Sequence, residues 1–255
     1  MSTSFLSWPG RFSGQVAVIT GGADGLGFAI ARRLHSEGAT VWLLDRDQGL
    51  AAAAVAKLGA GAHCVTADIS DESAVENAFA QVVASHGRVD IAINSAGIVG
   101  PNNLRITETP TDGYERVLKV NLLGSFHVTK QAIRHMQSRN YGRVLLIASI
   151  AGKDGNAGMC AYSSSKAGVI GLTKSVGKEY AESGITINAL APAVVRTALV
   201  DGMEPDQVKY MTDKIPMKRC GTLEEVAAIA AWIVSSEASF NTGFTFDLTG
   251  GRAVY

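Results

Sequence analysis

Cysteine is scarce in this sequence. Its 255 residues include three cysteines, Cys64, Cys160 and Cys220, which form no CxxC pair and stand far from any histidine at metal-ligand spacing. So sparse and odd a set argues against a disulfide framework and against a zinc site. We therefore predict no metal, and the reducing environment of the cytoplasm suits the chain best.

Long hydrophobic runs are missing as well. Stretches such as Val144 to Ala148 are far shorter than the ~20 residues that a membrane helix needs. The first fourteen residues lack the basic start and apolar run of a secretory signal peptide. We expect no membrane partner, and we assign residues 1–13 to an N-terminal extension. There Phe5, Leu6 and Trp8 either pack on the body or on a neighbouring subunit, or belong to a frayed tail.

The chain has no excess of charge of either sign. Lysine plus arginine number 23 and aspartate plus glutamate number 23, so the formal net charge is zero. A nucleic-acid or polybasic membrane binder would need surplus positive charge, so we expect neither kind of partner. Weak self-repulsion is compatible with oligomers. The hydrophobic share of 47% excludes a mostly disordered chain.

Short β-branched runs alternate with helical periodicity along most of the chain. The first expected helix carries Leu26, Ile30 and Leu34 at helical spacing, and another begins after a cap at Ser70. The other expected helices cover residues 48–58, 112–137, 161–180 and 223–235. This alternation predicts an α/β fold: a single Rossmann-type doubly wound domain at 14–255, with helices on both faces of a parallel sheet. Residues 198–221 have no clear period and are predicted to be a substrate loop or lid. The seven expected strands are 16–19, 41–44, 63–66, 91–93, 143–148, 186–190 and 245–248.

A glycine-rich turn joins the first expected strand to the first helix. Gly21, Gly25 and Gly27 there would let backbone N–H groups approach a pyrophosphate at a helix N-terminus, although ordinary tight-turn chemistry also uses glycine. Asp45 follows Gly27 by 18 residues at the end of the second strand, where a carboxylate can bind ribose hydroxyls and would repel a 2′-phosphate. Asp24 adds negative charge that Arg46 only partly offsets, so we predict NAD as cofactor rather than NADP.

Tyr162 and Lys166 are four residues apart on an expected helix, so their side chains share one face. A nearby ammonium would stabilise the phenolate and lower the pKa of Tyr162, which could then exchange a proton with a substrate oxygen. Ser149 ends a strand 13 residues before Tyr162, where ligands of open α/β sheets bind. A Tyr-x-x-x-Lys pair alone is usually a surface pair; its combination with Ser149 and a nucleotide loop indicates catalysis.

These residues, in this order, resemble the short-chain dehydrogenase/reductase family over about residues 14–251. The resemblance implies that Asn121 kinks its helix and holds a water for proton relay, and that Lys166 also bonds the nicotinamide ribose. Ser95 and Ala193 depart from the family pattern, and the backbone at Ala193 should avoid positive φ. The motifs that carry the resemblance are Thr20-Gly21…Gly25-Leu26-Gly27, Asp68-Ile69, Asn94-Ser95-Ala96-Gly97, Asn121, Ser149, Tyr162, Lys166 and Pro192…Thr197.

The same resemblance assigns the remaining cofactor contacts. Asp68 and Ile69 would contact the adenine. Pro192 through Thr197 would cover the nicotinamide, with Val195 bonding its carboxamide. The residues expected beside the cofactor ribose, where they also stabilise the sheet, are Asn94, Ala96 and Gly97.

The substrate is expected to be a small molecule. Lys153, Asn156 and Met159 are candidates for the rim of its pocket, and Arg252 would pair with an anionic substrate across a subunit interface. The sequence is most like family members that oxidise sugars or sugar acids, such as the 2-keto-3-deoxy-L-fuconate and 2-keto-3-deoxy-L-rhamnonate 4-dehydrogenases. By resemblance, a homotetramer is expected, with a dimer as the alternative.

Two other functions stay open. One is a reductase of 3-oxoacyl groups on acyl carrier protein, which Asp45 and the few basic residues near His127 fit poorly. The other is a dinucleotide-sensing scaffold without catalysis, which would not need a proton relay.

Overall fold

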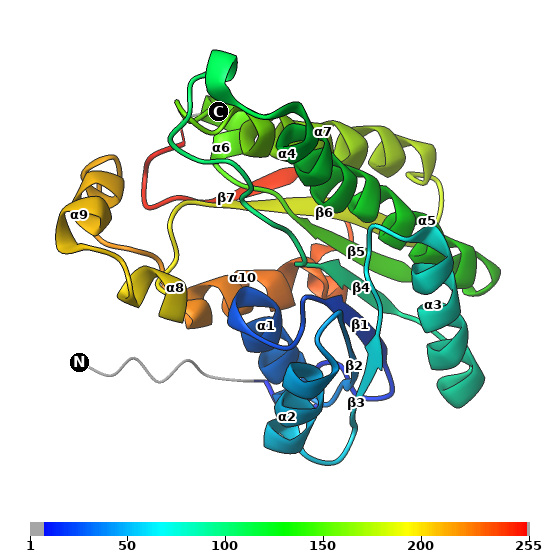
Figure 1. The fold of residues 1–255 in the computed structure, drawn as a ribbon. Coiled ribbons are helices and arrows are strands. Elements are labelled where there is room, and N and C mark those ends of the chain that lie inside the picture. Colours follow the sequence, from blue (N-terminus) through cyan, green and yellow to red (C-terminus); the bar gives the residue numbers. More distant parts are fainter. Residues whose placement is uncertain (1–7, 254–255) are drawn as a thin grey trace.

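Seven strands pair in parallel to form one sheet in the computed structural model, which describes residues 8–253 (Figure 1). The spatial order is β3-β2-β1-β4-β5-β6-β7, so the order reverses between β1 and β4. A crevice for ligands forms at such a switch point, outside the carboxyl ends of the strands. The strands are β1 Val16–Thr20, β2 Thr40–Asp45, β3 Ala62–Thr66, β4 Ile91–Asn94, β5 Gly142–Ile147, β6 Ile185–Pro192 and β7 Thr245–Leu248.

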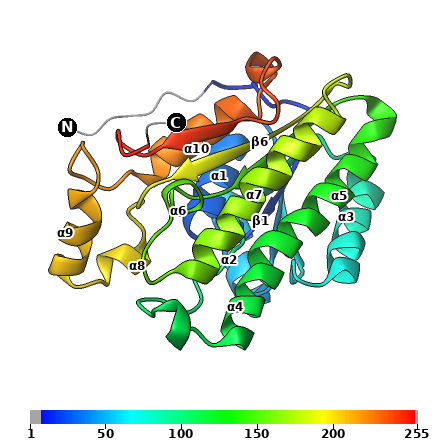
Figure 2. The ribbon, with the colours of Figure 1, turned by 90° about the horizontal axis from the view of Figure 1, so that it is seen from above.

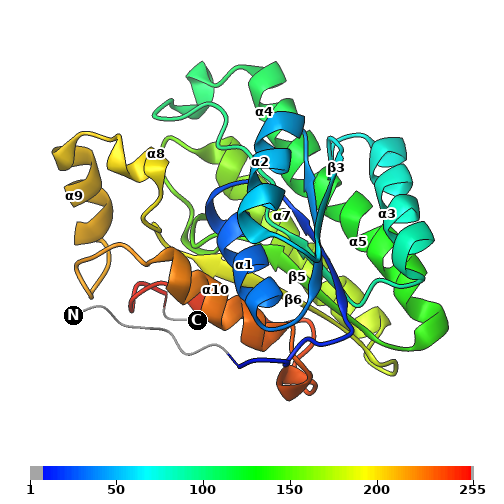
Figure 3. The same ribbon diagram turned by 90° about the horizontal axis from the view of Figure 1, so that it is seen from below.

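Helices cover both faces of the sheet. One face carries α1 (Gly25–Ser36), α2 (Gln48–Leu58) and α10 (Leu223–Ile233) (Figure 3). The other face carries α3 (Glu72–His86), α4 (Thr111–Leu118), α5 (Gly124–Met136) and α7 (Cys160–Glu179) (Figure 2).

Alternate side chains of β1 serve the two hydrophobic cores. Ile19 packs with Ile30 and Leu34 under α1, whereas Val18 belongs to the core beneath α3 that contains Phe79. The α/β architecture and all seven expected strands are thus confirmed.

The expected long helix at 112–137 is present with one irregularity. Residues Lys119–Leu123 form a π-helical turn between α4 and α5, and Gln137–Arg139 close the helix as a 3₁₀ turn. A π turn inserts one residue into the helical ladder and redirects the side chains around it. Here it carries Asn121, in agreement with the kink expected at that residue.

Two local expectations differ from the structure. The cap of α3 is Asp71, whose carboxylate accepts hydrogen bonds from the backbone of Ser73 and Ala74, so the expected cap at Ser70 is wrong. Ser70 instead donates its N–H to Asp68 in the preceding turn. The predicted lid is also partly ordered, as the two helices α8 (Ala198–Asp201) and α9 (Pro205–Asp213).

Short elements complete the chain. Helix α6 (Ala151–Asp154) lies between β5 and α7, and 3₁₀ turns occupy Ile106–Glu108 and Ser236–Ala238. Among the described helices, none has the length and apolar character to cross a membrane.

Of the N-terminal extension, Phe5 and Leu6 lie outside the described residues. Trp8 donates its backbone N–H to the Glu37 carboxylate at 3.3 Å, and the Arg11 guanidinium lies 5.4 Å from the centre of its ring. The described end of the extension therefore packs on the body of the chain, although the Trp8 side chain stays largely exposed.

Candidate active site

A cavity of about 400 Å³ opens at the carboxyl ends of β1, β4, β5 and β6. The strand order reverses between β1 and β4, so the loops that follow these strands diverge and leave a crevice at this edge of the sheet. Of the residues singled out from the sequence, the cavity gathers Gly21, Asp24, Leu26, Ala96, Gly97, Ser149, Tyr162, Lys166, Pro192, Val195 and Thr197.

A second hollow of about 180 Å³ continues the first toward β2. The two share Gly21, Ala96, Gly97 and Ile98, so together they form one elongated groove across the switch point. The groove is therefore suited to an extended ligand with chemically different ends. From the sequence-predicted set, the second hollow adds Asp45, Arg46, Asp68 and Ile69.

The middle of the groove is a backbone cradle that has no room for side chains. Gly21 has φ +58°, and a Cβ there would lie 2.9 Å from the backbone of Ala96. A Cβ on Gly27 would lie 2.1 Å from the carbonyl oxygen of Gly21. Helix α1 begins at Gly25, and among the described residues the side chain of its N-cap Asp24 makes no capping hydrogen bond. First-turn N–H groups thus remain for an anionic ligand, with the positive end of the helix dipole behind them.

Asp45 lies where β2 enters the second hollow. One of its carboxylate oxygens accepts a hydrogen bond from the Asp47 N–H at 3.2 Å, and the other accepts one from the Ala23 N–H at 3.4 Å. These bonds tie Asp45 to the glycine-rich loop. Nearby, a hydrogen bond from the Ser70 backbone is the main reason why the pKa of Asp68 is lowered. This end of the groove thus presents two carboxylates, with Arg46 beside them.

At the opposite end, Tyr162 and Lys166 lie on one face of α7, as the sequence predicts. The Lys166 Nζ is 5.7 Å from the centre of the Tyr162 ring and donates a hydrogen bond of 2.7 Å to the Ile147 carbonyl oxygen. Ser149, which follows β5, hydrogen-bonds the Tyr162 phenol. The Ser149 oxygen also accepts the Ala151 N–H at 3.1 Å, so the hydroxyl is held in place.

The pKa of Tyr162 does not follow the expectation. In the chain alone it is raised, because burial disfavours the phenolate, and the hydrogen bond with Ser149 only partly opposes this. Burial likewise lowers the pKa of Lys166 to about 8. The expected lowering of the Tyr162 pKa is therefore wrong for the chain alone: burial outweighs the Ser149 hydrogen bond, and the Lys166 ammonium donates its hydrogen bond to the Ile147 carbonyl.

Asn121 links the helix α4–α5 to the loop after β4. Its side-chain amide donates to the Ile98 carbonyl at 2.9 Å and to the Ser165 hydroxyl at 3.0 Å, and its oxygen accepts the Ile98 N–H at 2.8 Å. A Cβ on Gly97 would lie 3.1 Å from that oxygen. Asn121 is thus nearly buried just behind the groove, between the loop at Gly97 and the helix of Lys166.

Several predicted site residues do not line the groove. Asn94 is buried beneath it, where it bonds Thr20 and donates to the Ser125 hydroxyl at 2.8 Å. Thr20 in turn accepts the Ala96 N–H at 3.2 Å, so this network fixes the loop after β4. The other predicted residues outside the groove lining are Gly25, Gly27, Asn121, Lys153, Asn156, Met159 and Arg252.

The cations proposed for the substrate end have partners within the chain. The Lys153 ammonium contacts the Asp247 carboxylate at 2.8 Å, and Arg252 pairs with Asp154 at 3.1 Å and with the Asn156 oxygen at 3.0 Å. The expected contact of Arg252 with an anionic substrate stays a prediction, because the guanidinium is engaged by these two residues.

Some lining residues escaped the sequence analysis. Ile98 and Val99 extend the motif that ends at Gly97, so their position in the same loop was an available signal. Ile147 and Ala148 lie on the strand that ends at Ser149 and reach the groove through the same strand end. In the described part of the chain, no group of three or more histidine, cysteine or carboxylate side chains is arranged to hold a metal ion.

Known proteins are similar to this chain in sequence and in fold. A family model described as "Enoyl-(Acyl carrier protein) reductase" matches residues 21–252. A 2-dehydro-3-deoxy-L-rhamnonate dehydrogenase (NAD(+)) from Sphingomonas sp. (strain SKA58) is 45% identical over 246 residues, 96% of this chain and 98% of that protein. The 3-oxoacyl-(acyl-carrier-protein) reductase FabG of Salmonella typhimurium is 34% identical over 94% of this chain and 98% of its own length.

Among solved structures, a crystal structure of NAD+-bound xylitol dehydrogenase aligns with a TM-score of 0.90. It is 31% identical and covers 94% of this chain and 99% of its own. The extent of these matches, added to the switch-point groove and the Ser149, Tyr162 and Lys166 set, defines the class of the protein. The chain belongs to the short-chain dehydrogenase/reductase family.

Proposed function

We propose that this protein is an NAD-dependent dehydrogenase that interconverts a secondary alcohol and a ketone on a sugar acid. The observation that carries the proposal is the groove itself. One end presents Tyr162 bonded to Ser149 with Lys166 beside it, and the other end presents Asp45. An extended ligand that fills the groove would bring its reactive end to a proton donor and its other end to a carboxylate.

The groove fits a dinucleotide. The Gly21 and Gly27 positions leave no space for a Cβ, and the free N-terminus of α1 suits a pyrophosphate. Asp45 would accept hydrogen bonds from the adenosine ribose and would repel a 2′-phosphate, which supports NAD over NADP. When bound, NAD supplies the hydride acceptor. The residues that would hold it are Gly21, Asp24, Gly25, Leu26, Gly27, Asp45, Arg46, Asp68, Ile69, Ala96, Gly97, Tyr162, Lys166, Pro192, Val195 and Thr197.

Proton transfer belongs to the chain's own residues. In the oxidative direction the Tyr162 oxygen takes the proton of the substrate hydroxyl, and in the reductive direction it returns that proton to the carbonyl oxygen. Ser149 holds the same substrate oxygen by a hydrogen bond. With NAD bound, the positive charges of the Lys166 ammonium and of the oxidised nicotinamide would together help to offset the burial that raises the pKa of Tyr162. Asn121 fixes the backbone of Ile98, in the loop that lines the groove opposite these groups.

The choice of a sugar acid rests on similarity. The Sphingomonas relative, at 45% identity, is named for a keto-deoxy sugar acid, whereas the FabG relative is 34% identical and Asp45 opposes the NADP that such reductases generally use. The structural neighbour named for xylitol supports a polyol-like substrate as well. Residues 198–221 would form the lid over this substrate, and 14–255 one cofactor-binding domain.

A substrate panel tests the proposal. Purified protein would be given NAD or NADP with sugar acids and polyols, and NADH or NADPH with the 3-oxoacyl substrate of a FabG-type reductase. We expect NADH to form with a sugar acid, and Tyr162→Phe to lower turnover by about 10²–10⁴-fold while NADH still binds. Tyr180→Phe, at the far end of α7, is the control. Faster turnover of the 3-oxoacyl substrate with NADPH would favour the reductase. NADH binding without any turnover would favour the non-catalytic sensor.

We also propose that the chain assembles as a homotetramer, with a dimer as the simpler alternative. Two apolar surfaces support this. The helix patch consists of Leu118, Leu122, Leu123, Phe126 and Leu172 on α4, the π turn, α5 and α7. The strand patch consists of Trp232, Phe240, Phe244 and Phe246 around β7. Two separate patches would allow two kinds of subunit contact, as a tetramer with dihedral symmetry requires.

We also propose that the protein is located in the cytoplasm. Cys64, Cys160 and Cys220 are free, which suits a reducing compartment.

A further inference from the structure

The end of β7 and the chain beyond it contact helix α6. We call residues 247–253, which include the last two residues of β7, the C-terminal segment. Asp247 of this segment contacts the Lys153 ammonium through both carboxylate oxygens, at 2.8 and 3.0 Å. Arg252 contacts the Asp154 carboxylate at 3.1 Å and donates to the Asn156 side-chain oxygen at 3.0 Å. The segment therefore holds the last two residues of α6 and Asn156, which follows shortly after them.

These contacts are more sheltered than ordinary surface ion pairs. The side chains of Lys153 and Arg252 are 9% and 15% exposed, and those of Asp247 and Asp154 are each 30% exposed. By comparison, the Arg32–Glu224 pair on the outer helices is 57% and 47% exposed. Sheltered pairs are screened less by salt and water, so they restrain the groups that they join more firmly.

Helix α6 in turn rests directly on the helix of Tyr162 and Lys166. A Cβ on Gly152 would lie 2.6 Å from the carbonyl carbon of Lys166, which means that the two backbones are in close contact. A little further on, the Asn156 N–H donates to the Ser163 hydroxyl at 3.1 Å, next to Tyr162. A displacement of α6 would thus move the backbone near both Tyr162 and Lys166 on α7.

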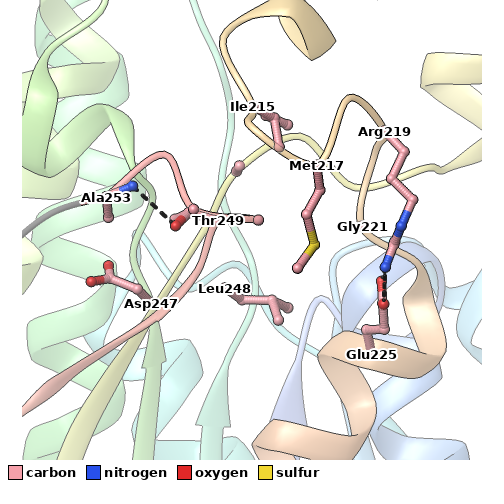
Figure 4. A pocket seen from close by; sticks show the side chains of 12 residues that line it. Ile215, Met217, Arg219, Gly221, Glu225, Asp247, Leu248, Thr249 and Ala253 are labelled. Atoms are coloured by element: carbon pink, nitrogen blue, oxygen red, sulfur yellow. Dashed lines mark hydrogen bonds and ion pairs between the residues drawn. The ribbon is translucent and has the colours of Figure 1, made fainter.

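On its other side the C-terminal segment faces the end of the lid, and a cavity of about 390 Å³ lies between them. In Figure 4, Leu248 and Thr249 lie on one side of this cavity and Ile215 and Met217 on the other. The Met217 N–H donates to the Gly250 carbonyl at 3.1 Å across this region. The lid end also packs closely at Gly250, where a Cβ would lie 2.7 Å from the Ile215 side chain. The segment is therefore restrained from the lid side by this packing and from the other side by its polar contacts with α6.

We propose that Arg252 is a positioning residue of the active site: through Asp154 and Asn156 it fixes α6, and α6 fixes Ser149 and the Tyr162 end of α7. This inference rests on the proposed function, and it differs from a direct contact between Arg252 and the substrate. A substrate contact would matter only for anionic substrates and would not need Asp154. A positioning role needs Asp154 and is indifferent to the charge of the substrate.

The test compares Arg252→Ala, Arg252→Lys, Asp154→Asn and the double variant Arg252→Ala/Asp154→Asn, each with a sugar acid and with a neutral polyol. We expect kcat/KM to fall about 10- to 100-fold for Arg252→Ala with both substrates, mainly in kcat, since small misplacements at reacting groups have effects of this size. Arg252→Lys should recover part of the loss. Asp154→Asn should lower kcat/KM as well, and the double variant should be no worse than Arg252→Ala. The NADH dissociation constant should change less than twofold.

Arg32→Ala is the matched control, because it removes a guanidinium from a carboxylate far from the groove and should leave kcat/KM unchanged. The proposal is overturned if Arg252→Ala acts only on the anionic substrate while Asp154→Asn is harmless, or if neither variant affects turnover.

Amide hydrogen exchange distinguishes a failure of the positioning role of Arg252 from a failure of the proposed dehydrogenase function. Arg252→Ala should speed amide exchange in residues 151–165 relative to Arg32→Ala, whether or not a substrate is found. Unchanged exchange there would overturn the positioning role even if the wild-type protein turned over none of the panel.

Discussion

Tyr162 and Ser149 set how the activity depends on pH. Oxidation of an alcohol needs the Tyr162 phenolate, so kcat/KM in that direction should rise as pH rises through the Tyr162 pKa. Burial raises this pKa and the hydrogen bond with Ser149 lowers it. Ser149→Ala removes the lowering contribution, and the rising limb of the oxidation profile should therefore move to higher pH. The measurement is kcat/KM against pH for both proteins.

The sign of that shift is the decisive observation. A rising limb that moves to lower pH in Ser149→Ala would contradict the role given to the hydroxyl. Ser163→Ala, one residue from Tyr162, is a control that alters a neighbouring hydroxyl without touching the phenol. It should leave the pH of the limb unchanged, even if it lowers the rate.

Asp45 should decide between the two nicotinamide cofactors. Replacement of Asp45 by Ser removes a negative charge beside the site of the 2′-phosphate and keeps a hydroxyl for the ribose. We expect the ratio of kcat/KM with NAD to that with NADP to fall by about tenfold or more, which corresponds to ~1.4 kcal/mol. Asp47→Ser is the control, because Asp47 caps α2 two residues after Asp45. It tests whether the loss of any nearby carboxylate changes the preference for NAD over NADP. An equal change in both variants would remove the special role of Asp45.

Among the elements of the site, the turn from β1 into α1 has no room for a side chain at Gly27. A Cβ on Gly27 would come within 2.1 Å of the Gly21 carbonyl oxygen, so Gly27→Ala must displace the backbone of the phosphate cradle. We expect the free energy of unfolding to fall by ~1–3 kcal/mol and NADH binding to weaken. Urea titration and NADH fluorescence measure the two effects.

Gly49→Ala in α2 is the matched control for Gly27→Ala. The nearest atom to a Cβ at Gly49 is 3.5 Å away, which is ordinary van der Waals contact. Since alanine favours helix over glycine, Gly49→Ala should raise the free energy of unfolding by up to ~1 kcal/mol. Similar losses in both variants would show that helix context, and not the cradle, governs the effect.

The sequence was most informative where one period or one spacing determines an element. Helix α2 has the predicted bounds, and the spacing of Tyr162 and Lys166 placed both on one face of α7. It was least informative where several residues compete for one role. Asp68, Ser70 and Asp71 are all capping residue types, and only the tertiary turn decides that Asp71 caps α3. The ion pair between Arg252 and Asp154 joins residues that no periodicity relates.

At the scale of the whole molecule, long-range pairs explain why part of the site was unpredictable. Arg252 meets Asp154 and Asn156 across separations of 98 and 96 residues, and no local pattern encodes such a contact. The groove itself was predictable because parallel strands bring their carboxyl ends to one edge of the sheet. Motifs at strand ends therefore converge, whereas the path of the chain after β7 is set by packing and by polar contacts between residues far apart in the sequence.

The two apolar patches make a prediction about assembly. Phe126 of the helix patch is 42% exposed and Phe244 of the strand patch is 56% exposed, so a glutamate at either position would bury a charge in a subunit contact. If the protein is a tetramer, Phe126→Glu and Phe244→Glu should each give dimers, and the double variant should give monomers. Leu50→Glu on α2, where the leucine is 44% exposed, lies on neither patch and should keep the wild-type mass. Analytical ultracentrifugation measures all four; if a single variant retained the wild-type mass, its patch would not be a subunit contact.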